Sequence, residues 1–444
     1  MKKTIYFLLA GCFCLASCGQ KQTEPATTVH LKGQLTDMGT VDVPMRYDGA
    51  SSLLGNSRDI LLHTDSAGYF DTIVTIKEPA YYSICRNTLY LTPGDDLTLK
   101  ITQSNQEAEF QGIGAEANNY MKYRLFPKGG SFLEAGENLR SSFDATKVLI
   151  DSLAAERQKQ LDGLTNVSAT FKELETARIR ADVANSYICY GSYARVEDRA
   201  AFTAQIAPYV QPLLAGLNND AYLDVAVVRD VLSYAFSPMK NQWASGIEFS
   251  PHISELYRSA EWIEKLNSQV TKQLTDSVTA YAATLNDSAF KAEVIAKVEQ
   301  SGKLLPGHPA FDIELEDTEG NTIHLSDLKG NVLYVDLWAT WCGPCKQESP
   351  YFEKLAKAYA GKAVTFVPVS TDTNKKAWLS YLAHEKKALK QYNSVDTSLR
   401  THWEIHYIPR FLVIDKNFNI VDAYAPRPSE KEKITALLDR LLAE

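Results

Sequence analysis

Cysteine is scarce in this chain, which has seven cysteines in 444 residues. Three of them, Cys12, Cys14 and Cys18, lie within the first 18 residues, so only four remain for the rest of the chain. Four cysteines so far apart in the sequence are too few to stabilise a fold of this size through disulfide bonds, so a disulfide-rich scaffold is excluded.

Long hydrophobic runs and an excess of positive charge are also missing. After the N-terminus no stretch is long and apolar enough to span a bilayer. Lysine plus arginine (46) are outnumbered by aspartate plus glutamate (54), and the net charge of −8 argues against nucleic acid as a partner. With 45% hydrophobic and 23% charged residues the composition is that of a globular protein, and the length suits about three domains.

The N-terminus has the pattern of an export signal. Lys2 and Lys3 precede a short apolar run, so residues 1–17 are predicted to be a signal peptide. Residues 15–18, Leu-Ala-Ser-Cys, resemble the bacterial lipobox, which implies a lipid on Cys18 that holds the protein to a membrane through a tether over residues 18–27. Gly19 is not the aspartate associated with inner-membrane retention, and no acidic cluster follows. The expected location is therefore the periplasm, on the inner leaflet of the outer membrane.

Two segments with different hydrophobic patterns follow, the first typical of strands and the second of helices. Residues 28–112 alternate apolar and polar positions between glycine and aspartate turns, which predicts a small antiparallel β-sandwich or barrel. From residue 116 to residue 300 the period becomes helical, with Asp287 as an expected helix cap. This helical segment has no motif for phosphate, metal or hydrolysis, and we interpret its tyrosine-rich patches as bundle core: Tyr187, Tyr190 and Tyr193.

The most informative stretch is residues 333–350, LYVDLWATWCGPCKQESP. Residues 332–338 are almost continuously apolar, which indicates a central strand covered on both faces. A helical stripe follows Cys345, so Cys342 is expected near a helix N-terminus, where free N–H groups favour a thiolate. Pro344 suits the first turn of such a helix. We expect Cys342 to attack and the more buried Cys345 to resolve.

The dithiol needs help from proton-handling groups. Lowering a thiol pKa from about 8.5 to about 7 raises the thiolate fraction at pH 7 roughly 16-fold, but about 5-fold is lost again as weaker nucleophilicity. The lowered pKa alone therefore makes exchange only slightly faster, and most of the rate must come from the second thiol and from the group that accepts its proton. Asp336 and Glu348 are the candidates. The competing interpretations are an edge-strand charge for Asp336 and an ordinary helix-dipole complement for Glu348.

A lone Cys-x-x-Cys can also be half of a zinc site. No second pair is present, and Cys85 and Cys189 lie far away without nearby ligand partners, so no metal is expected. We expect Cys85 and Cys189 to be small buried hydrophobic residues.

Residues 338–350, with the Trp-Cys-Gly-Pro-Cys core and Glu348, resemble the active site of the thioredoxin superfamily, specifically the membrane-tethered TlpA/ResA thiol:disulfide oxidoreductases. The match extends over residues 305–444, in which residues 364–369 correspond to a strand, 374–384 to a helix and 408–415 to a proline-led strand. It implies an α/β thioredoxin fold at 308–444, and we expect residues 301–307 to be the linker that leads into it. The β segment in turn resembles an N-terminal domain of unknown function that often precedes thioredoxin domains in exported proteins of gut-type bacteria.

The resemblance also implies roles for individual residues. Pro409 is expected to be cis, which places the Ile408 backbone beside Cys342 to pair with an extended client segment. Asp336 takes the place of the buried acid of thioredoxins, and Glu348 that of the TlpA/ResA glutamate. Trp341 is expected to form a pocket wall. We also expect Arg410 to be an exposed cation that favours acidic client segments.

The function implied is the reduction of protein disulfides in the periplasm, with the Cys342–Cys345 disulfide as the only redox group and no separate cofactor. Disulfide-bearing clients and a membrane electron donor are the expected partners. Two alternatives stay open: a disulfide isomerase, and a chaperone-like or client-binding lipoprotein whose thioredoxin fold is an accessory.

Overall fold

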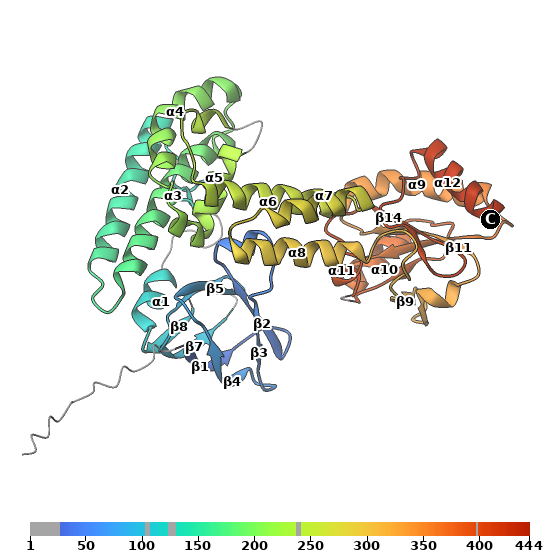
Figure 1. Ribbon diagram of the computed structural model, residues 1–444, viewed down its shortest axis with the longest axis horizontal. Helices are drawn as coiled ribbons and strands as arrows, with labels where there is room; N and C mark the ends of the chain where they lie inside the picture. The colour runs from blue at the N-terminus through green and yellow to red at the C-terminus, as the bar shows by residue number, and fades with distance from the viewer. Residues whose placement is uncertain (1–26, 103–106, 123–129, 237–240, 397) are drawn as a thin grey trace, which may run out of the picture.

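The computed structural model describes residues 27–102, 107–122, 130–236, 241–396 and 398–444, and Figure 1 shows a β part, a helical part and a mixed C-terminal domain in that order. The predicted signal peptide, Cys18 and all but the last residue of the predicted tether lie outside the described residues. None of the described helices is long and apolar enough to cross a membrane.

The β part consists of two four-stranded sheets with the orders β4-β1-β7-β8 and β3-β2-β5-β6. Side chains from both sheets share one core, with Leu31 and Met45 fully buried in it. The strands are β1 (Thr28–Leu35), β2 (Asp42–Tyr47), β3 (Ile60–His63), β4 (Tyr69–Thr75), β5 (Ala80–Ile84), β6 (Asn87–Leu91), β7 (Asp96–Ile101) and β8 (Glu109–Gly112).

Two expectations for the β part need correction. Strands β1 and β7 pair in parallel, so the part is not purely antiparallel, and both sheets are open, so the described strands close no barrel. Alternating apolar residues show which face of a strand is buried, but they do not show the direction of its partner.

The helical part has side-chain caps at most helix starts. The cap predicted at Asp287 is confirmed, because its Oδ1 accepts a hydrogen bond from the Phe290 N–H at 2.8 Å. Tyr187 and Tyr190 are buried in the bundle, whereas Tyr193 is 41% exposed and is not part of the core. The helices are α1 (Ala115–Lys122), α2 (Phe143–Asp162), α3 (Ala169–Tyr193), α4 (Arg199–Ala215), α5 (Ala226–Phe236), α6 (Pro251–Ser268), α7 (Lys272–Ala283) and α8 (Ser288–Gly302).

The β part and the helical part are joined by buried polar contacts. The Tyr81 hydroxyl of β5 donates a hydrogen bond to Glu175 of α3 at 2.7 Å, and Glu175 forms a 2.7 Å ion pair with Arg178. Arg229 of α5 forms a 2.6 Å ion pair with Asp48 of the β part. Since charges leave water only when they are paired, these contacts fix how the two parts dock.

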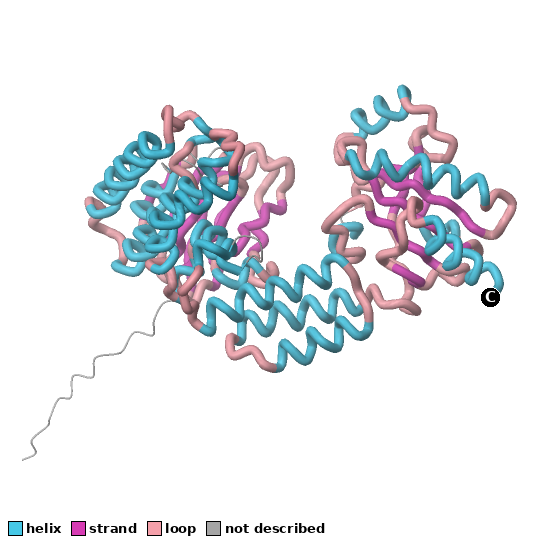
Figure 2. The backbone as a smooth tube through the Cα atoms, turned by 90° about the horizontal axis from the view of Figure 1, so that it is seen from above, coloured by secondary structure: helices cyan, strands magenta, loops and turns pink. Residues whose placement is uncertain are grey.

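Helices α6, α7 and α8 form a layer that reaches from the first two parts to the C-terminal domain, as Figures 1 and 2 both show. The linker expected at residues 301–307 is wrong in its first residues. Ser301 and Gly302 form the last turn of α8, Ser301 is fully buried, and Leu304 already belongs to the core of the C-terminal domain. Helix α8 thus leads directly into this domain.

The C-terminal domain is built on a seven-stranded sheet with the order β10-β9-β13-β12-β11-β14-β15. Strand β11 (Val332–Trp338) is central, parallel to β12 (Val364–Ser370) and antiparallel to β14 (Arg410–Ile414). Helices α9 (Gly343–Ala358) and α12 (Lys431–Ala443) pack on one face, and helix α10 (Lys375–His384) brings Trp378 against the Cys-x-x-Cys segment. The remaining elements are β9 (Glu314–Asp317), β10 (Thr322–His324), β13 (Tyr392–Asn393), α11 (Ser398–Thr401) and β15 (Ile420–Asp422). This topology is a thioredoxin-like fold.

Candidate active site

The Cys-x-x-Cys segment lies where strand β11 ends and helix α9 begins. Cys342 is the N-cap of α9, and its Sγ accepts a hydrogen bond from the Cys345 N–H at 3.2 Å. The two cysteines form a disulfide with their Cα atoms 5.3 Å apart, and their residues are 4% and 2% exposed. When the disulfide is reduced, the N–H groups of this first turn would stabilise a thiolate on Cys342.

The Ile408 backbone stands beside the disulfide. The Ile408–Pro409 peptide bond is cis, as the resemblance implied, and the Ile408 carbonyl oxygen lies 3.8 Å from Cys342 Sγ. Trp341, the residue before Cys342 in the chain, is 70% exposed. An extended chain that paired with the Ile408 backbone would therefore bring its own sulfur to Cys342.

Asp336 is buried beneath the disulfide. It lies on the central strand β11, all of whose residues are buried, so the edge-strand interpretation is wrong. Asp336 is 4% exposed, and its Oδ1 has no hydrogen-bond partner among the described residues. Burial, reinforced by the negative charge of Glu348, raises the pKa of Asp336 from 3.8 to about 8, with Lys387 acting in the opposite direction.

A small cavity connects Asp336 with the second cysteine. Its volume is about 10 Å³, room for roughly one water molecule, and Asp336, Cys345 and Lys387 all line it. The Lys387 Nζ donates a hydrogen bond to the Ser349 Oγ at 2.7 Å, and the lysine side chain is 15% exposed. The sequence analysis missed Lys387, because a lysine in a loop far along the chain gives no local signal.

Glu348 is also buried, but it points elsewhere. Its carboxylate accepts hydrogen bonds from the Ser429 N–H at 3.1 Å and the Ser429 hydroxyl at 2.8 Å. It does not line the cavity that Asp336 shares with Cys345. Glu348 therefore affects the site through its charge on Asp336. Because it is only 8% exposed, it is not a solvated helix-dipole complement.

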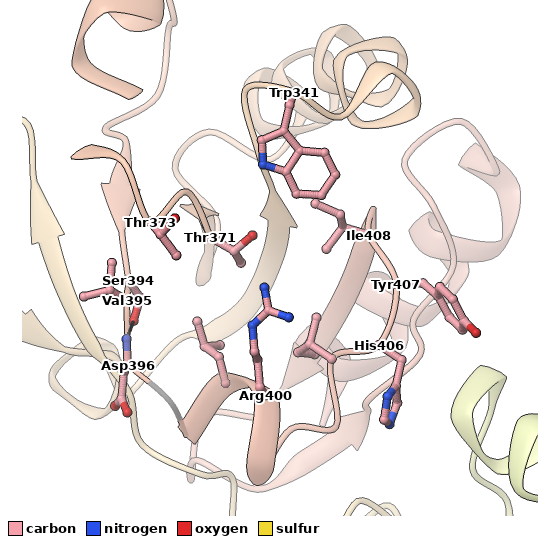
Figure 3. A pocket seen from close by; sticks show the side chains of 12 residues that line it. Trp341, Thr371, Thr373, Ser394, Val395, Asp396, Arg400, His406, Tyr407 and Ile408 are labelled. Carbon is pink, nitrogen blue, oxygen red and sulfur yellow. Dashed lines mark hydrogen bonds between the residues drawn. The ribbon is translucent and has the colours of Figure 1, made fainter. Parts of the chain in front are cut away.

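A groove opens beside the disulfide, with a volume of about 470 Å³. We call it the Trp341 groove. Figure 3 shows Trp341 and Ile408 close together at one end of the groove, and the Ile408 carbonyl oxygen lies 3.8 Å from Cys342 Sγ. Of its residues, sequence reasoning had found only these two. The others come from the turns after β12 and β13, from helix α11 and from the segment before Pro409: Thr371, Thr373, Ser394, Val395, Asp396, Leu399, Arg400, Ile405, His406 and Tyr407.

The C-terminal part of the chain matches a known family. Residues 301–438 match the Redoxin family model. We call residues 301–438 the Redoxin domain after this match. The chain is 29% identical over 122 residues to the thiol-disulfide oxidoreductase ResA of Halalkalibacterium halodurans, and 30% identical over 115 residues to that of Bacillus subtilis. These matches cover 28% and 26% of this chain and 57% and 64% of the relatives, so the chain spans less than two thirds of their length.

Solved structures are similar over the same region. A crystal structure of a candidate thiol-disulfide oxidoreductase from Bacteroides vulgatus is 62% identical, covering 31% of this chain and 98% of that chain with a TM-score of 0.31.

The expectation for Arg410 of the Redoxin domain is wrong. Arg410 is 7% exposed, donates a hydrogen bond from Nε to the Ala423 carbonyl, and stacks 3.2 Å from the centre of the Tyr424 ring. Burial lowers its pKa. Arg410 is the first residue of the inner strand β14, and its side chain turns into the domain, so it cannot meet a client as a free cation.

The two cysteines outside the Redoxin domain take no part in the site. Cys85 is exposed in the turn between β5 and β6 with a φ of 52°, and Cys189 on α3 is partly buried, so the expected burial is wrong for Cys85. Its position in a two-residue hairpin turn explains the exposure. Over the described residues, no three His, Cys, Asp or Glu side chains are grouped to hold a metal ion.

Proposed function

We propose that this protein reduces protein disulfides by thiol–disulfide exchange through Cys342 and Cys345. The observation that carries the proposal is the disulfide at the N-terminus of α9, with the Ile408 carbonyl 3.8 Å from Cys342 and the buried Asp336 in the cavity that Cys345 lines. This arrangement supplies an attacking sulfur, a backbone edge for a client strand and a proton acceptor for the second thiol.

The exchange has two steps. The Cys342 thiolate attacks one sulfur of a client disulfide, which forms a mixed disulfide and releases the other client sulfur as a thiolate. Cys345 then gives its proton to Asp336 and attacks Cys342, so the first client sulfur leaves as a second thiolate. The client gains two electrons, its two thiolates take up protons, and the Cys342–Cys345 disulfide remains. A membrane electron donor would return this disulfide to the dithiol.

Reduction is favoured over oxidation because Gly343 and Pro344 between the cysteines are the pair found in thioredoxin, whose potential is about −270 mV. An isomerase would instead need to leave its client with the same number of disulfides. A scrambled client separates these cases, because a reductase lowers the number of its disulfides while an isomerase rearranges them. A chaperone-like protein would bind the client without changing its thiol content.

Trapping tests the proposal directly. Cys345→Ser should accumulate mixed disulfides with clients, because attack proceeds and resolution does not, whereas Cys342→Ser should trap nothing. Cys85 is exposed and could form adducts of its own, so both variants are best made in a Cys85→Ser background. Adducts in the Cys342→Ser protein alone would reverse the two roles.

We further propose that the protein is exported and held on the periplasmic side of the outer membrane by a lipid on Cys18. The support is the lipobox-like sequence at residues 15–18. Cys18→Ala should release the protein from the membrane fraction and abolish incorporation of labelled fatty acid. Unchanged fractionation would contradict the lipid anchor.

A further inference from the structure

The Trp341 groove contains a cation that sequence analysis did not find. Arg400 of α11 is exposed, and Figure 3 shows its guanidinium directed into the groove toward the space between Thr371 and Ile408. Within the ranges that the structure describes, Arg400 has no hydrogen-bond or ion-pair partner. A guanidinium directed into an open groove without a carboxylate partner is available to a ligand.

The other charged residues of the groove do not cancel this charge. Figure 3 shows the Asp396 carboxylate directed away from the Arg400 guanidinium. Burial and the positive charge of Lys297 lower the pKa of His406, so its imidazole is neutral at pH 7. Arg400 is thus the permanent charge that the groove presents.

The walls of the groove are apolar and open. Trp341 is 70% exposed and Val395 is 65% exposed, and Ile408 lies beside Trp341. Soluble proteins rarely leave large apolar side chains together at the surface unless the surface binds something. A ligand that fits this groove has an apolar group for the walls and an anionic group for Arg400.

We propose that Arg400 selects clients whose reactive cysteine lies close in sequence to an apolar residue and a carboxylate, from either an acidic side chain or the chain terminus. This inference rests on the proposed function. Ile408 connects the two sites, because its carbonyl lies 3.8 Å from Cys342 Sγ and the same residue lines the groove. A client strand paired with Ile408 would continue over the groove, where its carboxylate could accept a bidentate hydrogen bond from the guanidinium.

Matched peptide disulfides test the inference. One peptide carries Glu beside an apolar residue near its cysteine, the second carries Gln instead, and a third is neutral except for a free C-terminal carboxylate. Each is reduced by the full chain and by its Arg400→Gln variant. A Glu near a cysteine alters the reactivity of the peptide itself, so the readout is the Glu/Gln ratio of kcat/KM compared between the two proteins.

A hydrogen bond to a charged group is worth about tenfold or more in binding. The Glu/Gln ratio should therefore fall about tenfold in Arg400→Gln, mainly through a higher KM for the Glu peptide. Added salt should shrink the ratio for the unmodified protein but not for the variant. Arg400→Glu should reverse the preference toward a Lys peptide. The third peptide shows whether a terminal carboxylate serves as well as a side chain.

Lys354→Gln is the control, because it removes one positive charge from an exposed position on α9 outside the groove. An equal loss of the Glu/Gln ratio in Lys354→Gln, or an unchanged ratio in Arg400→Gln, would overturn the inference while leaving the proposed function intact. Failure to reduce any of the peptides would overturn the proposed function, and this inference with it.

Discussion

Replacing Asp336 with Asn should slow the second step of the exchange and change its pH dependence. In that step the Cys345 thiol must lose its proton before it can attack Cys342. A thiol has an ordinary pKa of about 8.5, so transfer to a carboxylate of pKa 3.8 would be uphill by about 6 kcal/mol. Because burial and Glu348 raise the pKa of Asp336 to about 8, the same transfer is uphill by less than about 1 kcal/mol. The asparagine cannot accept this proton.

Loss of a positioned general base costs about 100-fold or more. In the unmodified protein the resolution rate should rise with pH and level off above about 8, where Asp336 has lost its proton. In Asp336→Asn the rate should be at least about 100-fold lower at pH 7 and should keep rising above pH 8, as Cys345 ionises unaided. Glu348→Gln removes a charge that raises the pKa of Asp336, so its profile should shift to lower pH without the large loss.

The assay is a single turnover of the reduced protein with a peptide disulfide, quenched with acid at intervals between pH 6 and 10. Chromatography separates the mixed disulfide from the released peptide, so attack and resolution are timed independently. The rate at which Cys342 forms the mixed disulfide is the internal control and should change little in Asp336→Asn. A resolution rate with the same pH profile in both proteins would refute the role of Asp336.

The same buried carboxyl affects stability. The folded oxidised protein keeps a proton on Asp336 that the unfolded chain releases above pH 3.8, so its stability should fall as pH rises from about 4 to about 8 and then level off. The difference between the unfolded pKa of 3.8 and the folded pKa of about 8 limits this loss of folding stability to about 6 kcal/mol. Denaturant unfolding of the oxidised Redoxin domain within the full chain should show this slope, and Asp336→Asn should remove it. Parallel slopes in the two proteins would show that Asp336 ionises normally.

Two further predictions concern the join between α8 and the Redoxin domain. Lys297 and Glu404 form a 2.7 Å ion pair with side chains only 11% and 5% exposed, so Lys297→Met should destabilise the Redoxin domain by about 3 kcal/mol, and adding Glu404→Gln should recover most of that loss in urea unfolding. If Lys297→Met alone were as stable as the unmodified protein, this expectation would be wrong. Tyr407 donates hydrogen bonds to Glu264 of α6 at 3.1 and 3.3 Å next to Ile408, so Tyr407→Phe should raise the KM for a protein client without changing reduction of a small neutral disulfide. Equal effects on both substrates would indicate a general defect.

Much of the Redoxin domain could be predicted because its signals are local. The apolar run of β11, the cap position of Cys342 and the proline after Ile408 each follow from a few consecutive residues, and the structure places all three as expected. The helix expected at residues 374–384 is α10, with Asn374 as its cap.

What sequence reasoning could not find depends on contacts between distant segments. Arg410 was expected to face a client, but the Tyr424 ring and the Ala423 carbonyl enclose its side chain. The residues next to Arg410 in the sequence do not indicate these contacts. Lys387 reaches the cavity of Cys345 from a loop more than 40 residues away. Ser301 was expected to be the first residue of a linker, yet its hydroxyl donates a hydrogen bond to Glu404 at 2.8 Å. Glycine and proline in a segment show where a helix can stop, but not what it packs against.

The reduction potential of the Cys342–Cys345 pair tests the central claim most directly. The full chain in a Cys85→Ser background, equilibrated with glutathione buffers and then alkylated, would report the fraction of reduced Cys342 by mass. A protein that reduces disulfides should have a potential near the thioredoxin value of about −270 mV. A potential near about −120 mV, that of a strong periplasmic oxidant, would show that the pair donates disulfides instead of removing them.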